Sequence, residues 1–325
     1  MQSELEFEQL IPVAKKRRQR SKPAFTFIDL FAGIGGTRLG FESAGGKCVF
    51  TSEWDPHAQR TYQANFGELP AGDITTIPTA DIPDFDVLLA GFPCQPFSSI
   101  GRRQGFLHET QGTLFYDVAR IIKDKRPKAF LLENVPGLLT HDKGKTFEII
   151  RDTLRELGYT VDYKVLNSAD FGVPQQRKRI YIVGFRTENV GDSFQFSFPE
   201  GKKRPRYINE FLEKDAVGYS ISKKLQEGYM YKKDDGRPMV VDHGSKVQVK
   251  TLVASYHKIQ RLTGTFVRDG ETGLRLFTEK ECKAIMGFPS DFIIPVSRTQ
   301  MYRQFGNSVV VPVISAIAKN MVPSL

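Results

Sequence analysis

Cys94 lies within GFPCQPFSS, residues 91–99, immediately after the apolar run DVLLA. If DVLLA is a strand of an open α/β sheet, Cys94 lies at the carboxyl edge, where such folds bind their ligands. Neighbouring prolines fix the loop, and the polar Gln95, Ser98 and Ser99 argue against burial. We interpret Cys94 as a nucleophile; the alternative is an inert cysteine packed in the interior.

Three ionisable side chains lie at the ends of later apolar runs, one after its run and two where a run begins. Glu133 ends the run KAFLLEN at the same predicted edge. A carboxyl group near a thiol in a closed pocket can hold a raised pKa and donate a proton at neutral pH. Arg177 and Arg179 alternate on one face where the run RIYIVGF begins, so both are candidates for this pocket. The alternative for both arginines is a solvated position.

A glycine-rich turn follows the first apolar run, FTFIDLF. Its sequence AGIGGTRLG allows the backbone to approach a ligand closely, and Glu53 follows the next run, where an acidic residue can bind ribose hydroxyls. The third glycine of the GxGxxG fingerprint is missing, so the turn lacks the longer cradle that a pyrophosphate needs. We therefore expect a cofactor with an adenosine and no phosphates, such as S-adenosylmethionine; the alternative is a structural turn.

Two residues near this turn extend the predicted cofactor site. Trp54, the only tryptophan, follows Glu53 and is a candidate to flank an adenine ring. Asp73, in GDI, is a candidate to accept a hydrogen bond from the adenine amino group. Each has an equally plain alternative as a core or turn residue.

The elements that must position these residues are short strands alternating with helices. Between residues 25 and 186 the apolar runs FTFIDLF, KCVFTSE, DVLLAGF, KAFLLEN, YKVLNS and RIYIVGF are separated by helical patterns at 38–43, 112–123 and 145–157. This alternation is typical of βαβ units and predicts an α/β fold whose parallel sheet carries helices on both faces.

The remaining chain divides into three parts. Residues 1–24 contain KKRRQRSK and are expected to form a flexible basic arm, and residues 25–187 a catalytic and cofactor-binding domain. Residues 188–298 are rich in glycine, lysine and aromatic residues, with short strand candidates in MVVDHG and TGTFV, and predict a smaller domain. Residues 299–325 include VPVISAIAKNM, a helical pattern that we expect to pack back on the first domain.

Composition narrows the setting in which the protein acts. With 46 Lys and Arg against 37 Asp and Glu, the chain carries a net charge of +9, which favours polyanions such as nucleic acid as partners. Three scattered cysteines form neither a disulfide framework nor a metal site, which favours a reducing cytoplasm. No signal peptide and no apolar run of about 18 residues is evident, so no membrane partner is expected.

Taken in order, the short motifs resemble those of a known family. They are FAGIGG, EW at 53–54, GDI at 72–74, GFPCQPFS, GTLF at 112–115, ENV at 133–135, QQRKR at 175–179, RLFTEKECKAIMGFP at 275–289 and QFGNSVV at 304–310. The set is similar to that of DNA (cytosine-5)-methyltransferases of the bacterial restriction-modification type. The resemblance implies a Rossmann-like, S-adenosylmethionine-dependent α/β domain with a mixed, mainly parallel sheet, and a smaller irregular DNA-recognition domain with a hinge at 188–298.

The resemblance also implies a reaction. Cys94 would add to C6 of a cytosine flipped out of duplex DNA, and C5 would then take the methyl group of S-adenosylmethionine, without a metal. Glu133 would stabilise charge at N3 and the 4-amino group. Arg179 would contact the cytosine O2, and Arg177 would orient Glu133 or the Cys94 loop.

The same resemblance implies binding residues and partners. Gln95, Ser98 and Thr251 would contact DNA. The partner would be double-stranded DNA, with a cognate restriction endonuclease acting at the same site without direct contact, and the enzyme would be a cytoplasmic monomer. The cofactor site would be lined by Phe31, Gly33, Ile34, Gly36, Glu53, Trp54, Asp73, Ile74, Pro93, Leu114, Asn307 and Ser308.

Other functions remain as alternatives at this stage. An RNA cytosine-5 methyltransferase could share the scaffold, although the second cysteine of the large RNA class, in a Thr-Cys motif, is absent. A non-catalytic DNA-binding regulator would be expected to lack the cysteine or ENV, and both are present. A nicotinamide oxidoreductase fits neither the missing third glycine nor the PCQ loop.

Overall fold

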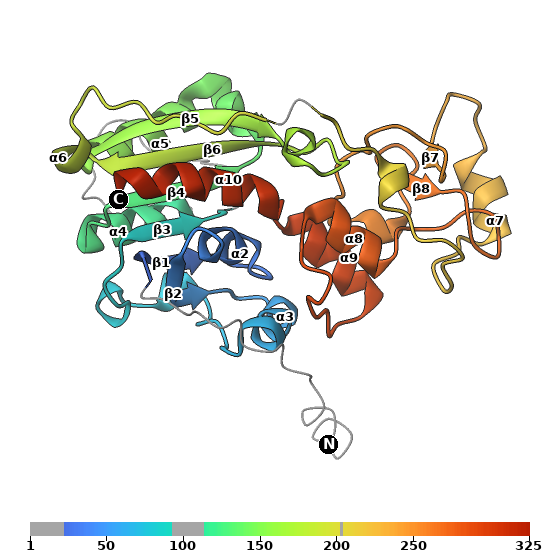
Figure 1. Cartoon of the computed structure of the whole chain (residues 1–325), viewed down its shortest axis with the longest axis horizontal. Helices are drawn as coiled ribbons and strands as arrows, with labels where there is room; N and C mark the ends of the chain where they lie inside the picture. The colour runs from blue at the N-terminus through green and yellow to red at the C-terminus, as the bar shows by residue number, and fades with distance from the viewer. Residues whose placement is uncertain (1–22, 93–113, 202–203) are drawn as a thin grey trace, which may run out of the picture.

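The computed structural model describes residues 23–92, 114–201 and 204–325. A larger unit built on a central sheet lies beside a smaller unit of short elements (Figure 1). The predictions for Pro93, Cys94, Gln95 and Ser98, and for nearly all of the basic arm, lie outside the described residues.

The larger unit contains a six-stranded sheet in the order β2-β1-β3-β4-β6-β5. Its first four strands are parallel, whereas β6 runs antiparallel to both β4 and β5. The bounds are β1 Phe25–Leu30, β2 Gly46–Ser52, β3 Val87–Ala90, β4 Ala129–Asn134, β5 Tyr159–Asn167 and β6 Lys178–Arg186. The expectation of a mixed, mainly parallel sheet is confirmed, and the purely parallel reading of the strand alternation is corrected at β6, which runs opposite to the other strands of this sheet.

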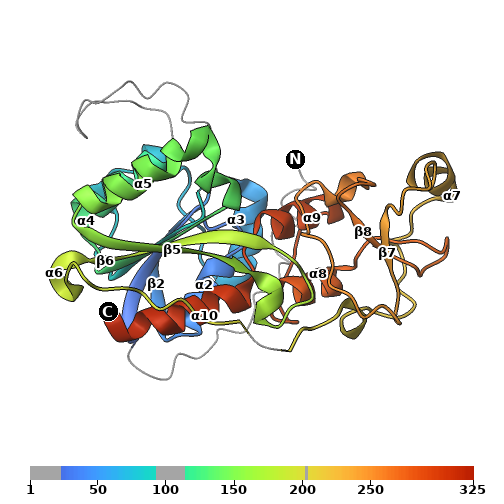
Figure 2. The same cartoon turned by 90° about the horizontal axis from the view of Figure 1, so that it is seen from above.

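Helices cover both faces of this sheet. Ile28 and Leu88 point to the core beneath α4 (Leu114–Lys125) and α5 (Lys145–Glu156). Phe27 and Leu89, one residue away, point to the other core beneath α2 (Gly36–Glu42) and α10 (Val311–Met321). Because neither face meets water, β3 is apolar at every position, and this makes the run readable in the sequence. Figure 2 shows α4 and α5 on one side of the sheet and α2 and α10 on the other.

The last helix packs where its sequence pattern predicts. α10 spans Val311–Met321 and lies against α2 (Gly36–Glu42), with a hydrogen bond of 3.0 Å between the hydroxyls of Ser43 and Ser315. Among the described residues, one stretch, Arg298–Ser324, has the length and composition of a membrane span. It comprises α9, α10 and a final turn, and 61% of its apolar window is buried, as expected for a core element of this fold.

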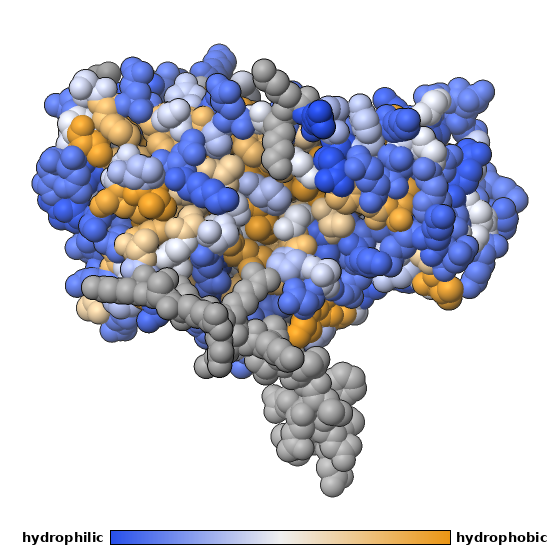
Figure 3. All heavy atoms as spheres, viewed as in Figure 1, coloured by the Kyte–Doolittle hydropathy of each residue, from blue (hydrophilic) through white to orange (hydrophobic). Residues whose placement is uncertain are grey.

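The smaller unit holds two short parallel strands and several turns (Figure 1). On the face shown in Figure 3, it is covered mainly by hydrophilic residues, whereas hydrophobic residues gather over the middle of the larger unit. The helices α8 and α9 connect the two units; they were not predicted from the sequence. The remaining bounds are α3 Pro56–Phe66, α6 Thr187–Val190, α7 Lys223–Leu225, β7 Met239–Val241, β8 Thr265–Val267, α8 Glu279–Met286 and α9 Arg298–Asn307.

Candidate active site

A cavity of about 920 Å³ opens at the carboxyl edge of the parallel strands. It is lined from the ends of β1, β2, β3 and β4, from the start of β6 and from α9. The sequence-predicted residues that line it are Phe31, Gly33, Ile34, Glu53, Trp54, Asp73, Ile74, Leu114, Glu133, Arg177, Arg179, Asn307 and Ser308. The structure therefore brings the predicted cofactor and base-binding residues into one cavity.

Glu53 follows β2 and is fixed by the glycine turn after β1. Its Oε2 accepts a hydrogen bond of 2.7 Å from the Gly33 backbone N–H, and its Oε1 accepts one of 2.8 Å from the Asp55 N–H. Burial raises the pKa of Glu53, while these two backbone N–H groups lower it. Gly33 adopts a φ of +54°, which favours glycine, and a side chain there would point into open space. The carboxylate keeps free lone pairs for the hydroxyls of a ribose.

Trp54 and Asp73 lie on the cavity wall beside Glu53. Trp54 is 77% exposed, which excludes the core alternative for this residue. The Asp73 carboxylate accepts hydrogen bonds from the N–H and hydroxyl of Thr75, at 3.0 and 2.9 Å, so the turn alternative holds for Asp73 alongside its position in the cavity. A flat exposed ring beside a fixed carboxylate fits an adenosine group.

Gly36 has a different role from the one expected of a cofactor contact. It is absent from the cavity wall and lies buried at the start of α2. A Cβ at this position would lie 2.9 Å from Oγ of Ser308 and 2.9 Å from Cγ2 of Val309. Gly36 is therefore a packing position that lets α2 approach the segment after α9, and its effect on the cavity is indirect.

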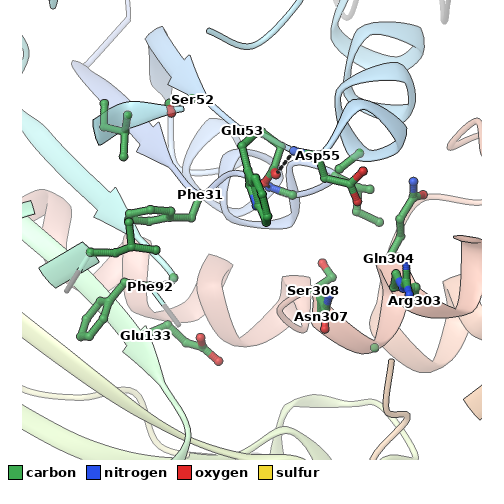
Figure 4. Close-up of a pocket in the computed structure, with 18 of the residues that line it drawn as sticks. Phe31, Ser52, Glu53, Asp55, Phe92, Glu133, Arg303, Gln304, Asn307 and Ser308 are labelled. Atoms are coloured by element: carbon green, nitrogen blue, oxygen red, sulfur yellow. Dashed lines mark hydrogen bonds between the residues drawn. The ribbon is translucent and has the colours of Figure 1, made fainter. Parts of the chain in front are cut away.

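Glu133, the next-to-last residue of β4, pairs with Arg179 of β6. The Nε of Arg179 lies 3.0 Å from Oε1 of Glu133, and each side chain is about one-sixth exposed or less (16% and 14%). Burial raises the pKa of Glu133, and the charges of Arg179 and Arg177 lower it. Burial is the larger effect, so the carboxyl group holds its proton to a higher pH than an ordinary glutamate. Figure 4 shows Glu133 across the cavity from Asn307 and Ser308.

Arg177 does not orient Glu133 by a hydrogen bond. Its Nη1 donates to the carbonyl of Leu252 at 3.0 Å, and its Nη2 donates to the carbonyls of Gly306 and Ser308 at 3.0 and 2.7 Å. Of the two roles expected of Arg177, a hydrogen bond that orients Glu133 is not formed, because three carbonyls from two distant segments take its donors and Arg179 pairs with Glu133 instead. The other expected role, orienting the Cys94 loop, concerns residues outside the described part of the chain. Burial and the charge of Arg179 lower the pKa of Arg177 to about 10, which leaves it charged at neutral pH.

Several lining residues were missed because α9 was not predicted. Gln304 joins α9 to α3: its Nε2 donates to the His57 carbonyl at 2.8 Å and its Oε1 accepts from the Thr61 hydroxyl at 3.0 Å. Arg303 lies exposed on the same helix and also lines the cavity (Figure 4). The polar sequence RTQMYRQFGN hides the helix, although the Ser297 side chain that caps it is a readable start signal.

Asn134 fixes the segment that follows β3, at a point two residues before Cys94. Its Nδ2 donates to the Phe92 carbonyl at 2.9 Å, and its Oδ1 accepts from the Val135 N–H at 2.8 Å. A Cβ at Gly91 would lie 3.6 Å from Oε2 of Glu133, so the residue that leads into the cysteine loop lies beside the carboxylate. The ends of β3 and β4 are therefore held together at the cavity.

Thr251 lies where the smaller unit meets the segment that leads into β6. Its hydroxyl donates a hydrogen bond of 2.7 Å to the Gln176 carbonyl, and the next N–H, of Leu252, donates to Oε1 of the buried Gln175 at 2.7 Å. Thr251 is outside the cavity wall, and its hydroxyl donor is already used. The oxygen can still accept a hydrogen bond.

The two described cysteines are poor nucleophiles. Cys48 and Cys282 are buried and free, and neither lines the cavity. Burial raises the pKa of Cys48 to about 12 and raises that of Cys282 well above its usual value. Thiolates react and thiols do not, so both are inert near neutral pH. Among the described residues, no group of three or more His, Cys, Asp or Glu side chains is arranged to hold a metal ion.

Comparison with known proteins places this site in a family. The family model of the C-5 cytosine-specific DNA methylases matches residues 25–323. The chain is 64% identical over 298 residues to the type II methyltransferase M.BsuFI of Bacillus subtilis, which covers 91% of this chain and 72% of that protein. It is 56% identical over 307 residues to the type II methyltransferase M.MspI of Moraxella sp, with coverage of 94% and 72%.

Solved structures agree at the level of the fold. The S. pombe Dnmt2 methyltransferase superposes with a TM-score of 0.74 at 23% identity, covering 92% of this chain and 99% of that one. A Spodoptera frugiperda DNMT2 mutant superposes with a TM-score of 0.72 at 23% identity, covering 91% and 99%. The family match extends over nearly the whole sequence from β1 onward, and the chain belongs to the C-5 cytosine-specific DNA methylase family.

Proposed function

We propose that this protein transfers a methyl group from S-adenosylmethionine to C5 of a cytosine within a specific sequence of double-stranded DNA. The observation that carries this proposal is a single cavity that contains both the fixed carboxylate of Glu53 and the buried pair of Glu133 and Arg179. A transfer reaction requires that donor and acceptor meet, and one cavity allows it.

The residues around Glu53 fit the cofactor. Bound S-adenosylmethionine would supply an electrophilic methyl group. Glu53 would accept hydrogen bonds from its ribose, and the exposed Trp54 ring would flank its adenine. Phe31, Ile74 and Leu114 supply apolar wall, and Asn307 and Ser308 supply polar groups from α9.

At the base, Cys94 is the nucleophile. Its sulfur forms a bond to C6 of the cytosine, which makes C5 nucleophilic. Glu133 donates its proton or a hydrogen bond to N3 as negative charge develops on the ring, and Arg179 both holds Glu133 and reaches toward O2. C5 takes the methyl group, and S-adenosylhomocysteine is left as the product. A base then removes the C5 proton, and cleavage of the sulfur–C6 bond restores the aromatic ring and frees Cys94. The inertness of Cys48 and Cys282 supports this assignment.

The cytosine must leave the duplex to reach this cavity. We assign duplex recognition to the smaller unit, residues 188–298, and cofactor binding to residues 25–187 together with the C-terminal segment 299–325. Gln95, Ser98 and Thr251 are the proposed DNA contacts at the cavity mouth. The net charge of +9 favours association with DNA phosphates.

The similarity to type II methyltransferases supports a place in a restriction-modification system. We propose a cognate endonuclease that recognises the same DNA site without touching this protein, a monomeric enzyme, and action in the cytoplasm, where the DNA substrate is found. The proposed chemistry is independent of a metal.

The test is methyl transfer from labelled S-adenosylmethionine to unmethylated genomic DNA and to total RNA, with bisulfite sequencing of the DNA product. We expect 5-methylcytosine at one short DNA motif for the wild type, far less of it for Glu133→Gln and none for Cys94→Ser. Transfer to RNA and not to DNA would support the RNA methyltransferase instead. Binding to DNA without any transfer would support the non-catalytic regulator.

A further inference from the structure

Arg261 of the smaller unit is buried, and all of the contacts of its guanidinium group are with one neighbouring loop. It is 6% exposed. Its Nε donates to the carbonyl of Met230 at 2.8 Å, and its Nη2 donates to the carbonyls of Lys233 and Arg237 at 2.8 and 3.1 Å. Both of its Nη atoms also pair with the Asp235 carboxylate. One side chain therefore fixes the path of residues 230–237.

The segment that carries Arg261 is itself fixed. The Oε1 of Gln260 accepts hydrogen bonds of 3.1 Å from the hydroxyls of both Ser255 and Thr263, which closes residues 255–263 into a compact loop. The ring of Tyr256 lies 5.9 Å from that of Phe266 and 5.6 Å from that of Phe277, in stacked arrangements. The segment 255–263, from which Arg261 extends, is thus held in one conformation.

The segment 255–263 is connected to the wall of the cavity. A Cβ at Gly306 of α9 would overlap the backbone of Val253 and Ala254, so these two segments of the chain are in direct contact. The preceding residue, Leu252, accepts a hydrogen bond from Arg177 at 3.0 Å. The arrangement runs from the cavity wall through residues 252–254 to the loop 255–263, and from Arg261 to residues 230–237.

The loop that Arg261 holds presents cations to solvent. Lys232, Lys233 and Arg237 are exposed, and Tyr231 is 49% exposed. The backbone of Arg237 is held at two points, because its N–H donates to Oδ1 of Asp235 at 3.1 Å and its carbonyl accepts from Arg261. Within the described part of the chain, its guanidinium makes no hydrogen bond or ion pair, although it lies near the charge of Asp235.

We propose that Arg261 is a positioning residue that presents the loop 230–237 to the DNA, and that Arg237 reads a base edge there; this inference rests on the proposed function. A fixed backbone with a free guanidinium is pre-organised for binding, and arginine to guanine is the commonest specific contact in the major groove. Lys232 and Lys233 beside it suit the phosphates of the same duplex.

A purely structural role leaves this arrangement without a reason. Arg275, also a buried arginine of the smaller unit, is 0% exposed and pairs with two carboxylates, those of Glu281 and Asp269, which stabilises the interior beside α8. The guanidinium of Arg261 makes its five contacts with the single stretch 230–237, which is exposed apart from the buried Met230 at its start. The burial of Arg261 therefore serves the shape of that loop, and the shape serves a ligand.

The experiment measures methylation rates on a pool of duplexes that carries the preferred site and all of its single base-pair variants, read by bisulfite sequencing. For Arg237→Gln we expect discrimination at one base pair to fall by roughly tenfold or more, with the other positions unchanged. For Arg261→Lys we expect the same base pair to relax and the KM for DNA to rise, while the KM for S-adenosylmethionine stays unchanged. Arg206→Gln is the matched control, because Arg206 pairs with exposed Glu210 in the same unit and touches neither loop.

Several outcomes would overturn the inference. A uniform loss of affinity for all duplexes in Arg237→Gln, with a shallower salt dependence, would mean a phosphate contact. An unchanged profile in Arg261→Lys would remove its positioning role. If Arg261→Lys fails to fold, Asp235→Asn loosens the same loop while keeping the bonds to the carbonyls, and it must relax the same base pair. A wild type that methylates no DNA overturns the proposed function, whereas an active wild type with unchanged variants overturns this inference alone.

Discussion

Arg179 and Glu133 form a largely buried ion pair in the candidate active site, with the Nε of Arg179 3.0 Å from Oε1 of Glu133. Arg177, two residues earlier, turns its donors to the carbonyls of Leu252, Gly306 and Ser308. The two arginines of one short motif therefore have different roles. Arg179 pairs with the Glu133 carboxyl group and lowers its pKa, whereas Arg177 joins the sheet to the smaller unit and to α9.

Replacing Glu133 by glutamine should abolish the pH dependence along with most of the rate. Burial raises the pKa of Glu133, so its proton is present below the raised pKa and is lost as the pH rises through it. The wild-type kcat/KM should therefore fall as the pH rises through that value. Glu133→Gln should be slower by roughly 10² to 10⁴-fold, with that limb of the profile flat. A Glu133→Gln variant that keeps the wild-type profile would show that another group titrates.

Removing the charge of Arg179 should change the pH at which kcat/KM falls. The Arg179 guanidinium lowers the pKa of Glu133, so Arg179→Met should raise that pKa further and shift the fall in kcat/KM to higher pH. Arg186→Met is the control, because Arg186 lies at the opposite end of β6 and pairs with the exposed Glu188. A shift to lower pH in Arg179→Met, or an equal shift in the control, would contradict the pairing.

Loss of Arg177 should weaken the fold more than the chemistry. Arg177→Met removes the donor from three carbonyls, two in buried residues and one in the half-buried Ser308, so the free energy of unfolding in urea should fall by about 3 kcal/mol or more. Arg177→Lys should recover part of this loss, because one ammonium group cannot reach all three carbonyls. A stable Arg177→Met protein with a normal KM for S-adenosylmethionine would mean that these contacts are dispensable.

Alanine at either tight glycine should loosen the C-terminal segment. Gly36→Ala would place its Cβ 2.9 Å from Oγ of Ser308, and Gly306→Ala would overlap the backbone of Val253 and Ala254. Each should lower the free energy of unfolding by roughly 1–3 kcal/mol, and Gly306→Ala by the larger amount because backbone cannot move aside. Gly228→Ala is the control, since its Cβ would meet open space. Equal stability of all three variants would rule out close approach at these positions.

Asp29 should make the protein less stable as the pH rises. It is completely buried in β1, and burial raises its pKa to about 8. The stability linked to its proton is fully present below the ordinary pKa of aspartate and is lost as the pH rises through about 8. Between pH 6 and pH 8 the loss should be roughly 2 kcal/mol. Denaturant unfolding of Asp29→Asn should lack this loss, and equal pH dependence in both proteins would show that Asp29 stays ionised.

The sequence made the parallel half of the sheet predictable for a physical reason. Strands covered on both faces are rich in apolar residues, so β3 and the first four residues of β4 stand out, and the edge at which these strands end predicts the position of Glu133. The glycine turn was equally readable, because Gly33 with its positive φ and Glu53 interact over only 20 residues. The family resemblance supplied the mixed sheet that the alternation of strands did not.

What escaped prediction depends on contacts between distant segments. The donors of Arg177 reach carbonyls 75 to 131 residues away, and no local pattern indicates this. The packing role of Gly36 could not be predicted for the same reason, since the atoms that leave no room for a side chain there belong to the distant residues Ser308 and Val309. Helix α9 was hidden because its buried residues, such as Tyr302 and Gln304, include polar groups that are satisfied only by tertiary partners.

The most direct measurement is to trap the enzyme on duplex DNA that carries 5-fluorocytosine at the methylated position, with S-adenosylmethionine present. Fluorine at C5 cannot leave as a proton does, so the sulfur–C6 bond should persist after methyl transfer. We expect a stoichiometric covalent complex for the wild type, with the adduct mapped by peptide mass spectrometry to Cys94, and none for Cys94→Ser. An adduct on Cys48 or Cys282, or methyl transfer to cytosine by Cys94→Ser at the wild-type rate, would contradict the mechanism.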